Sequence, residues 1–281
     1  MAAAVTGNPR TLTISDLGVL ADGPDDGLEA IVYLHGWGAS KELWWNALAM
    51  LSDRVRGYAL DLPGTGDTPL GHRLDSMGQL AAWTRDACGR LGLRRATLVG
   101  HSLGGNLAAQ MALDFPDFVK RLVLVDAALA TGSLPRRVYW TQSPKYGIPA
   151  IRAMRMATGP LAAIGARIPN NHRGGFWGPL ARRAGLFVAT NKSDAALQVQ
   201  LKLLCGNPLD AARLRAIRAP ILMVHGGLDG VIPVATAKGY ANALPGCRFK
   251  LFAASHHCPM DHDPPGFAHV LREFILDTAE D

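Results

Sequence analysis

Short apolar runs alternate with helical patterns along most of the chain, and this alternation is what most restricts its fold. Near-continuous apolar runs are typical of strands buried on both faces of a parallel sheet, and helices supply the crossovers that such a sheet needs. We therefore predict an α/β fold with a mostly parallel central sheet and helices on both faces. The expected strands are Glu29–Leu34, Val55–Leu60, Ala96–Val99, Arg121–Val125, Pro220–Val224 and Arg248–Ala253, and the expected helices are Leu43–Leu51, Met77–Arg90, Leu103–Phe115, Pro233–Leu244 and Pro265–Leu276.

The alternation stops between about residues 131 and 212, where prolines, glycines and helix-like pieces replace the strand pattern. This stretch is too long for a simple loop in a compact domain. We predict that residues 131–212 form a mostly helical cap, inserted into an α/β core of residues 1–130 and 213–281. Near the N-terminus, the runs TLTI and GVL predict one or two antiparallel strands at the sheet edge.

The composition is that of a globular protein, with 48% hydrophobic and 19% charged residues in a chain of 281. No apolar run approaches the roughly 20 residues of a membrane span, and the N-terminus lacks a signal-peptide pattern. The four cysteines show no metal-type spacing, which favours free thiols in a reducing compartment. We expect a cytoplasmic protein with no membrane span and no nucleic-acid partner, and the oligomeric state is left open.

The pentapeptide Gly100–Gly104, GHSLG, fits the pattern G-x-S-x-G and lies between a predicted strand and a predicted helix. A sharp strand-to-helix turn places the serine hydroxyl at the carboxyl edge of the sheet, and the glycines make room for the tight backbone. This context identifies Ser102 as the candidate nucleophile. The alternative is a helix-capping serine in a glycine-rich turn.

Two aspartates follow predicted strands and could orient a catalytic histidine. Asp229 lies in the loop GGLDGVIP after Pro220–Val224, and Asp126 comes directly after Arg121–Val125. An aspartate at the very end of a strand is more often a turn or capping residue, so we favour Asp229.

His256 and His257 follow the last predicted strand, and either could be the general base. The chain order Ser, Asp, His is that of serine hydrolases built on a parallel sheet. A metal site that includes His256, His257 and His262 is the alternative, but no carboxylate or cysteine cluster elsewhere in the sequence supports it. We therefore expect no metal and no cofactor.

Acyl transfer also needs two hydrogen-bond donors aimed at the developing oxyanion. One is expected to be the backbone N–H of the residue after the nucleophile, Leu103. The other comes from a loop after an earlier strand, where the sequence His35-Gly36-Trp37-Gly38 makes the N–H of Trp37 the candidate. We expect the side chain of His35 to be a structural hydrogen-bonding group.

Five motifs occur in a characteristic order: LHGWG, DLPGTGDT, GHSLGG, GGLDGVIP and HCPMDHDPPGF. On these residues the chain resembles the α/β-hydrolase superfamily, and within it the small cofactor-free esterases with a helical cap. The LHGWG stretch is similar to that of carboxylesterases acting on pimeloyl-carrier-protein methyl ester. In the family the catalytic histidine is followed after one residue by proline, which selects His257, although the family usually has glycine where this chain has His256.

The resemblance implies a serine hydrolase that cleaves a carboxylic ester or thioester through an acyl-enzyme, with Ser102, His257 and Asp229 as its triad. Relatives that use an aspartate nucleophile are excluded, because Ser102 occupies that position. Carbon–carbon bond hydrolases, lactonases and cofactorless perhydrolases share the serine triad and stay open as alternatives. A slow hydrolase-like ligand receptor is a further alternative from a different class.

The positive charge of the chain is concentrated in the predicted cap. Eleven Lys and Arg residues lie between Thr131 and Asp210, opposed only by Asp194 and Asp210, in a chain whose net charge is +6. Two interpretations remain open. The basic residues form a solvated outer face, or they rim an apolar acyl pocket and favour an anionic or carrier-protein-linked substrate.

Overall fold

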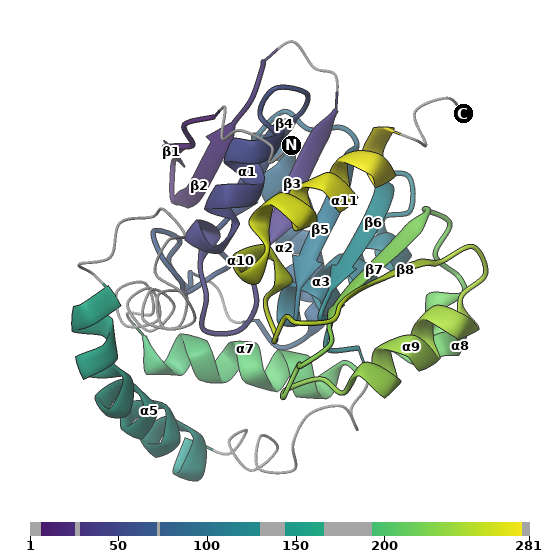
Figure 1. Cartoon of the computed structure of the whole chain (residues 1–281). Helices are drawn as coiled ribbons and strands as arrows, with labels where there is room; N and C mark the ends of the chain where they lie inside the picture. The colour runs from purple at the N-terminus through teal and green to yellow at the C-terminus, as the bar shows by residue number, and fades with distance from the viewer. Residues whose placement is uncertain (1–6, 26–28, 72–73, 130–143, 166–192, 277–281) are drawn as a thin grey trace.

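The computed structural model describes residues 7–25, 29–71, 74–129, 144–165 and 193–276. An eight-stranded sheet in the order β1-β2-β4-β3-β5-β6-β7-β8 forms the centre of the molecule (Figure 1). The strands are β1 (Arg10–Ile14), β2 (Leu17–Asp22), β3 (Ala30–Leu34), β4 (Arg56–Leu60), β5 (Ala96–His101), β6 (Val119–Val125), β7 (Ile221–Gly226) and β8 (Arg248–Phe252).

Strands β3 to β8 are parallel, and β1 and β2 form an antiparallel hairpin at the edge. The predicted fold class is therefore confirmed, and each of the six predicted parallel strands is present. Strand β5 runs two residues further than predicted, because Gly100 and His101 still pair with Leu124 and Val125 of β6. The sheet thus continues up to the residue that precedes Ser102.

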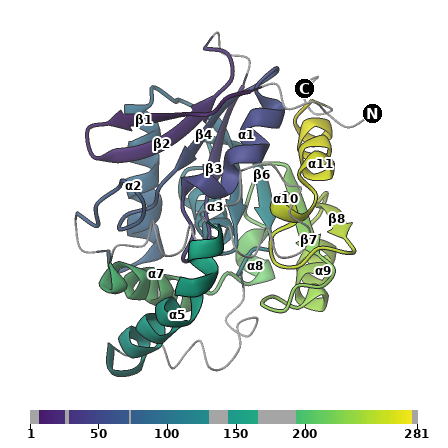
Figure 2. The ribbon, with the colours of Figure 1, turned by 60° about the vertical axis from the view of Figure 1, so that its left-hand side comes forward.

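Helices cover both faces of the sheet (Figures 1 and 2). One face packs against α2, α3 and α9, and the other against α1, α10 and α11. The predicted helix Leu43–Leu51 is divided, because a 3₁₀ turn at Lys41–Trp44 precedes the α-helix. The helices of the core are α1 (Trp45–Leu51), α2 (Met77–Arg90), α3 (Leu103–Asp114), α8 (Ala211–Leu214), α9 (Val234–Ala243), α10 (Pro259–His262) and α11 (Pro264–Leu276).

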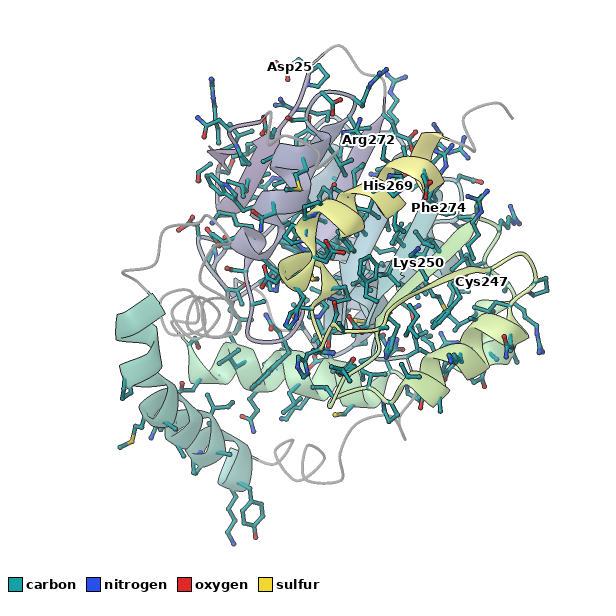
Figure 3. The ribbon with its side chains drawn as sticks, in the orientation of Figure 1. Asp25, Cys247, Lys250, His269, Arg272 and Phe274 are labelled. Atoms are coloured by element: carbon teal, nitrogen blue, oxygen red, sulfur yellow. The ribbon has the colours of Figure 1, made fainter. Side chains whose placement is uncertain are left out.

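Helix α11 is held against the sheet and α1 by aromatic and ionic contacts. The ring of Trp44 lies 5.2 Å from that of Tyr33 in β3 and 6.2 Å from that of Phe267, centroid to centroid. Arg272 lies further along the helix (Figure 3). Its guanidinium binds Asp53 through two hydrogen bonds, of 2.7 and 3.0 Å. These contacts keep the C-terminal part of the core close to its N-terminal part.

Two described helices lie within the predicted cap segment, α5 (Pro144–Gly165) and α7 (Asp194–Gly206). They lie side by side below the sheet in both views (Figures 1 and 2). Helix α7 contacts the core through Gln200, whose side-chain amide donates a hydrogen bond to the Pro63 carbonyl. The other residues of 131–212 lie outside the described ranges, apart from 193 and 207–212, and the domain boundaries stay a prediction.

None of the helices in the described ranges combines the length and apolar character needed to cross a membrane. All four cysteines fall within those ranges and carry free thiols, as the sequence predicts. Three of them, Cys88, Cys205 and Cys258, are buried. The fold therefore contains no disulfide among these residues, and its stability depends on packing and polar contacts.

A buried ionic cluster joins the loop after β3 to the loop after β4. The Lys41 ammonium is 2.6 Å from Asp61, 2.8 Å from Asp67 and 3.2 Å from Glu42, and both Lys41 and Asp61 are almost inaccessible to solvent. Burial disfavours the charge on Lys41, but attraction to Asp61 and hydrogen bonds to both aspartates outweigh it and raise its pKa. The cluster fixes the position of the loop that carries Trp37.

We predict that Lys41→Met destabilises the protein by about 3–5 kcal/mol, because it leaves the Asp61 carboxylate buried without its counterion. Lys120→Met is the matched control, since Lys120 is about one-third exposed and its partner Glu29 is also paired with Arg121. The control should cost less than about 1 kcal/mol. Urea unfolding of both variants provides the comparison, and equal losses would show that burial of the Lys41 pair does not matter.

Candidate active site

The loops that follow four parallel strands carry the residues singled out by the sequence. Trp37 follows β3, Ser102 follows β5, Asp229 follows β7 and His257 follows β8. Because these strands are parallel, their carboxyl ends lie at one edge of the sheet, which is where sites form in folds of this kind. The topology thus gathers at one edge residues that are far apart in the chain.

Ser102 occupies a sharp turn between β5 and α3. Its backbone is in a left-handed conformation, with φ of 53°, which is unusual for a residue other than glycine. The turn is over-determined by its surroundings, since the Ser102 N–H donates to the Val125 carbonyl at 3.0 Å. A Cβ atom at Gly104 would lie only 2.2 Å from the Leu34 carbonyl oxygen, so glycine is required there. This is the strained strand–turn–helix geometry expected for a serine nucleophile.

Asp229 and His257 are hydrogen-bonded to each other. His257 Nδ1 donates to Asp229 Oδ2 at 2.8 Å, and Asp229 Oδ1 accepts the backbone N–H groups of Val231 and Ile232. Burial opposes ionisation of Asp229, but the contact with His257 and the two amides outweigh it and lower its pKa to about 2. The aspartate therefore carries its charge across the neutral pH range and holds Nδ1 of His257 protonated, which leaves Nε2 as the proton acceptor.

The residue before Ser102 connects the nucleophile turn to the histidine loop. His101 Nε2 donates to the His257 carbonyl at 2.7 Å, and the two imidazole rings lie 4.8 Å apart between centroids. His101 is buried. The sequence does not predict this contact, because position x of G-x-S-x-G accepts many residue types and carries no signal of its own.

The rival aspartate has different partners. Asp126 is fully buried at the end of β6, and its Oδ1 accepts the Gly226 N–H at 2.9 Å. The same oxygen lies 3.2 Å from Nδ1 of His225, a residue to which the sequence analysis gave no role. Asp229 is the aspartate hydrogen-bonded to His257. The geometry therefore favours Asp229 as the orienting acid.

The rival histidine also points elsewhere. His256 Nδ1 donates to the Leu228 carbonyl at 3.0 Å, and its ring meets His262 edge-on with centroids 5.3 Å apart. This contact ties the loop after β8 to the loop after β7. His256 thus acts on the position of the neighbouring loop, while His257 faces Asp229.

Two groups of side chains among the described residues offer possible metal-ligand atoms within 4.8 Å of one another: His101 with Asp126 and His257, and Asp126 with His225 and Asp229. Each group includes a member of the Asp229–His257 pair, so a metal ion would compete with that hydrogen bond. The three histidines of the sequence alternative do not form such a group within the described ranges.

The loop after β3 packs directly against the nucleophile turn. A Cβ atom at Gly36 would lie 3.1 Å from the Ser102 Cβ. His35 anchors this loop, because its Nδ1 donates to the Gly36 carbonyl and its Nε2 accepts the Leu62 N–H at 3.0 Å. Burial lowers the pKa of His35, which keeps it neutral. Its role is structural, as the sequence predicts.

Trp37 connects the same loop to the predicted cap. Its indole Nε1 donates to the Leu197 carbonyl of α7 at 2.8 Å, and its ring packs against Ile151 of α5 and Leu197. The sequence indicates a role only for the backbone N–H of Trp37. The contact joins residues 160 positions apart, so no local pattern could have indicated it.

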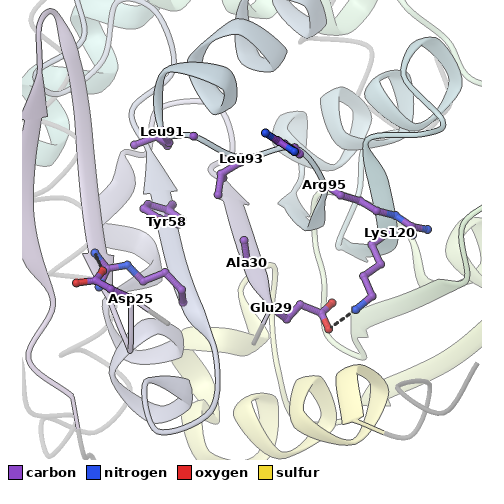
Figure 4. Close-up of a pocket in the computed structure, with 11 residues that line it drawn as sticks. Asp25, Glu29, Ala30, Tyr58, Leu91, Leu93, Arg95 and Lys120 are labelled. Carbon is purple, nitrogen blue, oxygen red and sulfur yellow. Dashed lines mark hydrogen bonds and ion pairs between the residues drawn. The ribbon is translucent and has the colours of Figure 1, made fainter. Parts of the chain in front are cut away.

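A pocket of about 600 Å³ opens near the starts of β3, β4 and β6 (Figure 4). Its lining includes Glu29, Arg56 and Lys120. The starts of parallel strands lie at the opposite edge of the sheet from their carboxyl ends. This pocket is therefore separate from the site that contains Ser102.

Comparison with known proteins identifies the family. Residues 29–147 match the model of the alpha/beta hydrolase fold. An uncharacterised protein of Mycobacterium tuberculosis is 30% identical over 275 residues, covering 89% of this chain and 76% of the relative. The pimeloyl-[acyl-carrier protein] methyl ester esterase of Vibrio vulnificus is 27% identical over 267 residues, covering 90% and 94%.

A crystal structure of a hydrolase from Pseudomonas aeruginosa has the same fold, with a TM-score of 0.76 and 22% identity over 96% of this chain and 98% of that one. The chain belongs to the α/β-hydrolase family. The resemblance drawn from the five sequence motifs is confirmed, and so is the enzyme class that it implies, an α/β-hydrolase related to esterases.

We predict that Asp229→Asn costs far more activity than Asp126→Asn, and His257→Ala far more than His256→Ala. The reason is that the 2.8 Å bond from His257 to Asp229 sets the tautomer of the base, whereas Asp126 and His256 bind backbone groups. Losses of about 10³-fold or more are expected for the first member of each pair. Turnover of p-nitrophenyl butyrate measures the activity of all four variants. An inactive Asp126→Asn variant beside an active Asp229→Asn variant would identify Asp126, at the end of β6, as the orienting acid.

Proposed function

We propose that the protein hydrolyses a carboxylic ester or thioester through a Ser102–His257–Asp229 triad and an acyl-enzyme intermediate. The observation that carries the proposal is the left-handed turn at Ser102, at the same sheet edge as the hydrogen-bonded Asp229–His257 pair. The similarity to a methyl ester esterase supports ester bonds as the substrate class.

In the first half-reaction, Nε2 of His257 takes the hydroxyl proton of Ser102 as the serine oxygen attacks the carbonyl carbon. The carbonyl oxygen becomes an oxyanion, which the backbone N–H groups of Trp37 and Leu103 stabilise. Leu103 is the first residue of α3, so its N–H has no acceptor within that helix. The imidazolium then protonates the leaving alcohol or thiol, and the acyl group stays on Ser102.

In the second half-reaction, His257 takes a proton from water, and the resulting hydroxide attacks the acyl-enzyme. Collapse of the tetrahedral intermediate releases the acid and returns the proton to Ser102. Asp229 stays ionised throughout because its pKa is about 2. Its negative charge stabilises the imidazolium in both steps and keeps the ring oriented.

The cap over residues 131–212 is proposed to select the acyl group. Its helices α5 and α7 supply Ile151 and Leu197, which pack on the indole of Trp37 next to the proposed oxyanion hole. An apolar surface at this position suits an acyl chain. The basic residues of the segment make an anionic or carrier-protein-linked ester the preferred substrate to test.

We predict that Ser102→Ala lowers turnover by about 10⁴-fold or more, because the nucleophile is lost while the fold is kept. Ser255→Ala is the matched control, since Ser255 is a similarly buried serine in the loop before His257. It should keep most of the wild-type activity. A serine-reactive phosphonate should label the wild type at Ser102 and leave the Ser102→Ala variant unlabelled, and full activity in that variant would refute the triad.

The same assay separates the other candidate functions. A panel of short and long acyl esters, thioesters, lactones and a carbon–carbon bond substrate compares kcat/KM between these reaction types. Saturable binding of an ester without steady-state turnover would instead support a ligand receptor.

We predict that an anionic ester loses kcat/KM as salt is added, while a neutral ester with the same acyl chain does not. Salt shortens the Debye length from about 10 Å at 0.1 M to about 3 Å at 1 M, which weakens steering by exposed charges. Charge reversal at Arg152 and Lys202 on α5 and α7 should reproduce the loss at low salt. If added salt changed kcat/KM equally for the two esters, we would conclude that the basic residues form only a solvated outer face.

A further inference from the structure

His225 lies between two carboxylates beneath the proposed triad. Its imidazole is buried in β7, with Nδ1 3.2 Å from Asp126 Oδ1 and Nε2 3.7 Å from Asp229 Oδ2. Nε2 is also 3.0 Å from the Ile232 carbonyl oxygen. The Asp229 oxygen that it approaches is the one that accepts the hydrogen bond from His257. The order of groups is therefore Asp126, His225, Asp229, His257.

Both ring nitrogens of His225 face oxygen atoms, and this determines how many protons His225 and Asp126 must hold between them. The Ile232 carbonyl can only accept a hydrogen bond, so Nε2 carries a proton. A neutral imidazole has no second proton, and its Nδ1 lone pair would then face the lone pairs of Asp126 Oδ1 at 3.2 Å. One further proton, on Nδ1 or on the Asp126 carboxyl, removes this repulsion.

The second proton also determines whether the pair of Asp126 and His225, which lies beside His257, is neutral or negatively charged. Ligand atoms of His101, Asp126 and His257 lie within 4.8 Å of one another, so an unneutralised Asp126 carboxylate would act strongly on His257. With the proton present, the pair of Asp126 and His225 is neutral wherever that proton resides. Burial lowers the pKa of His225, which favours the Asp126 carboxyl over the imidazole as the place of the second proton.

We propose that Asp126 and His225 form a buried pair that holds one proton, and that this pair positions and tunes His257 by keeping a second negative charge away from it. The groups that face the pair are His101 from β5, Asp229 from the loop after β7 and His257 from the loop after β8. Asp229 is then left to act on His257 as the orienting anion. The inference rests on the proposed role of His257 as the base.

The first test compares the pH dependence of kcat/KM for His225→Gln, Asp126→Asn and the double variant, with p-nitrophenyl butyrate as substrate. Glutamine cannot hold a proton, and its side-chain N–H₂ can donate to Asp126 Oδ1 in place of the shared proton. This favours the Asp126 carboxylate, so His257 is protonated at higher pH. The acidic limb should move up by about one pH unit, a tenfold loss at a fixed pH below it. Asparagine mimics a protonated carboxyl, so the single Asp126→Asn variant should keep the wild-type limb and the double variant should recover it.

A role confined to packing would lower stability without moving the limb. An unchanged limb in folded His225→Gln, or a downward shift of about one unit in Asp126→Asn, would overturn the proposal. The downward shift would mean that Asp126 is already ionised in the wild type. Thermal unfolding of each variant establishes that the proteins compared are folded.

A second measurement does not depend on turnover or on the His225 variant. In ¹⁵N-histidine-labelled Ser102→Ala protein, His225 should keep a proton at or hydrogen-bonded to Nδ1 from pH 6 to 8, together with the proton on Nε2. A bare Nδ1 over that range would overturn the pair. Retained activity in His257→Ala would refute the proposed function instead, so the two failures can be told apart.

Discussion

The parallel pairing of β7 with β8 is the constraint on which the site depends. Their register places Gly226 opposite Phe252, so the loops that carry Asp229 and His257 leave the sheet at the same level. A Cβ atom at Gly226 would lie 2.0 Å from the His256 carbonyl oxygen, so the two loops touch at a position where only glycine fits. The hydrogen bond between Asp229 and His257 follows from this close approach, because both side chains start from backbones already in contact.

Several polar groups buried at this edge are matched to one another, which is the condition under which a folded protein tolerates them. Lys41 neutralises Asp61, and His35 joins the loops after β3 and β4 as a neutral hydrogen-bonding group. The proposed proton between Asp126 and His225 follows the same principle. In each case a polar group that would destabilise the fold if buried alone instead holds a loop of the site in place through its partner.

The backbone and the side chain of Trp37 serve two different parts of the proposed site. Its backbone belongs to the loop proposed to stabilise the oxyanion, and its indole is bound to the Leu197 carbonyl in the segment proposed to select the acyl group. A displacement of α7 would therefore act directly on the residue proposed to donate a hydrogen bond to the oxyanion. The hydrogen bond between Trp37 and Leu197 thus connects the two proposed parts of the site directly.

The sequence alone was sufficient for the six parallel strands, the longer helices of the core and the turn at Ser102, because these depend on local patterns: apolar periodicity and a glycine-flanked turn. It did not predict the short helices α8 and α10 or the 3₁₀ turn before α1. From the sequence, Asp229 was preferred to Asp126 as the orienting acid only because an aspartate at a strand end is more often a turn residue. His257 was preferred to His256 as the base only through resemblance to a family. Tertiary structure favours one partner in each pair, since a hydrogen bond of 2.8 Å is a property of distance and direction. The contacts of His101, His225 and Trp37 could not be predicted at all. Each joins residues on different strands or helices, and only packing determines which of them meet.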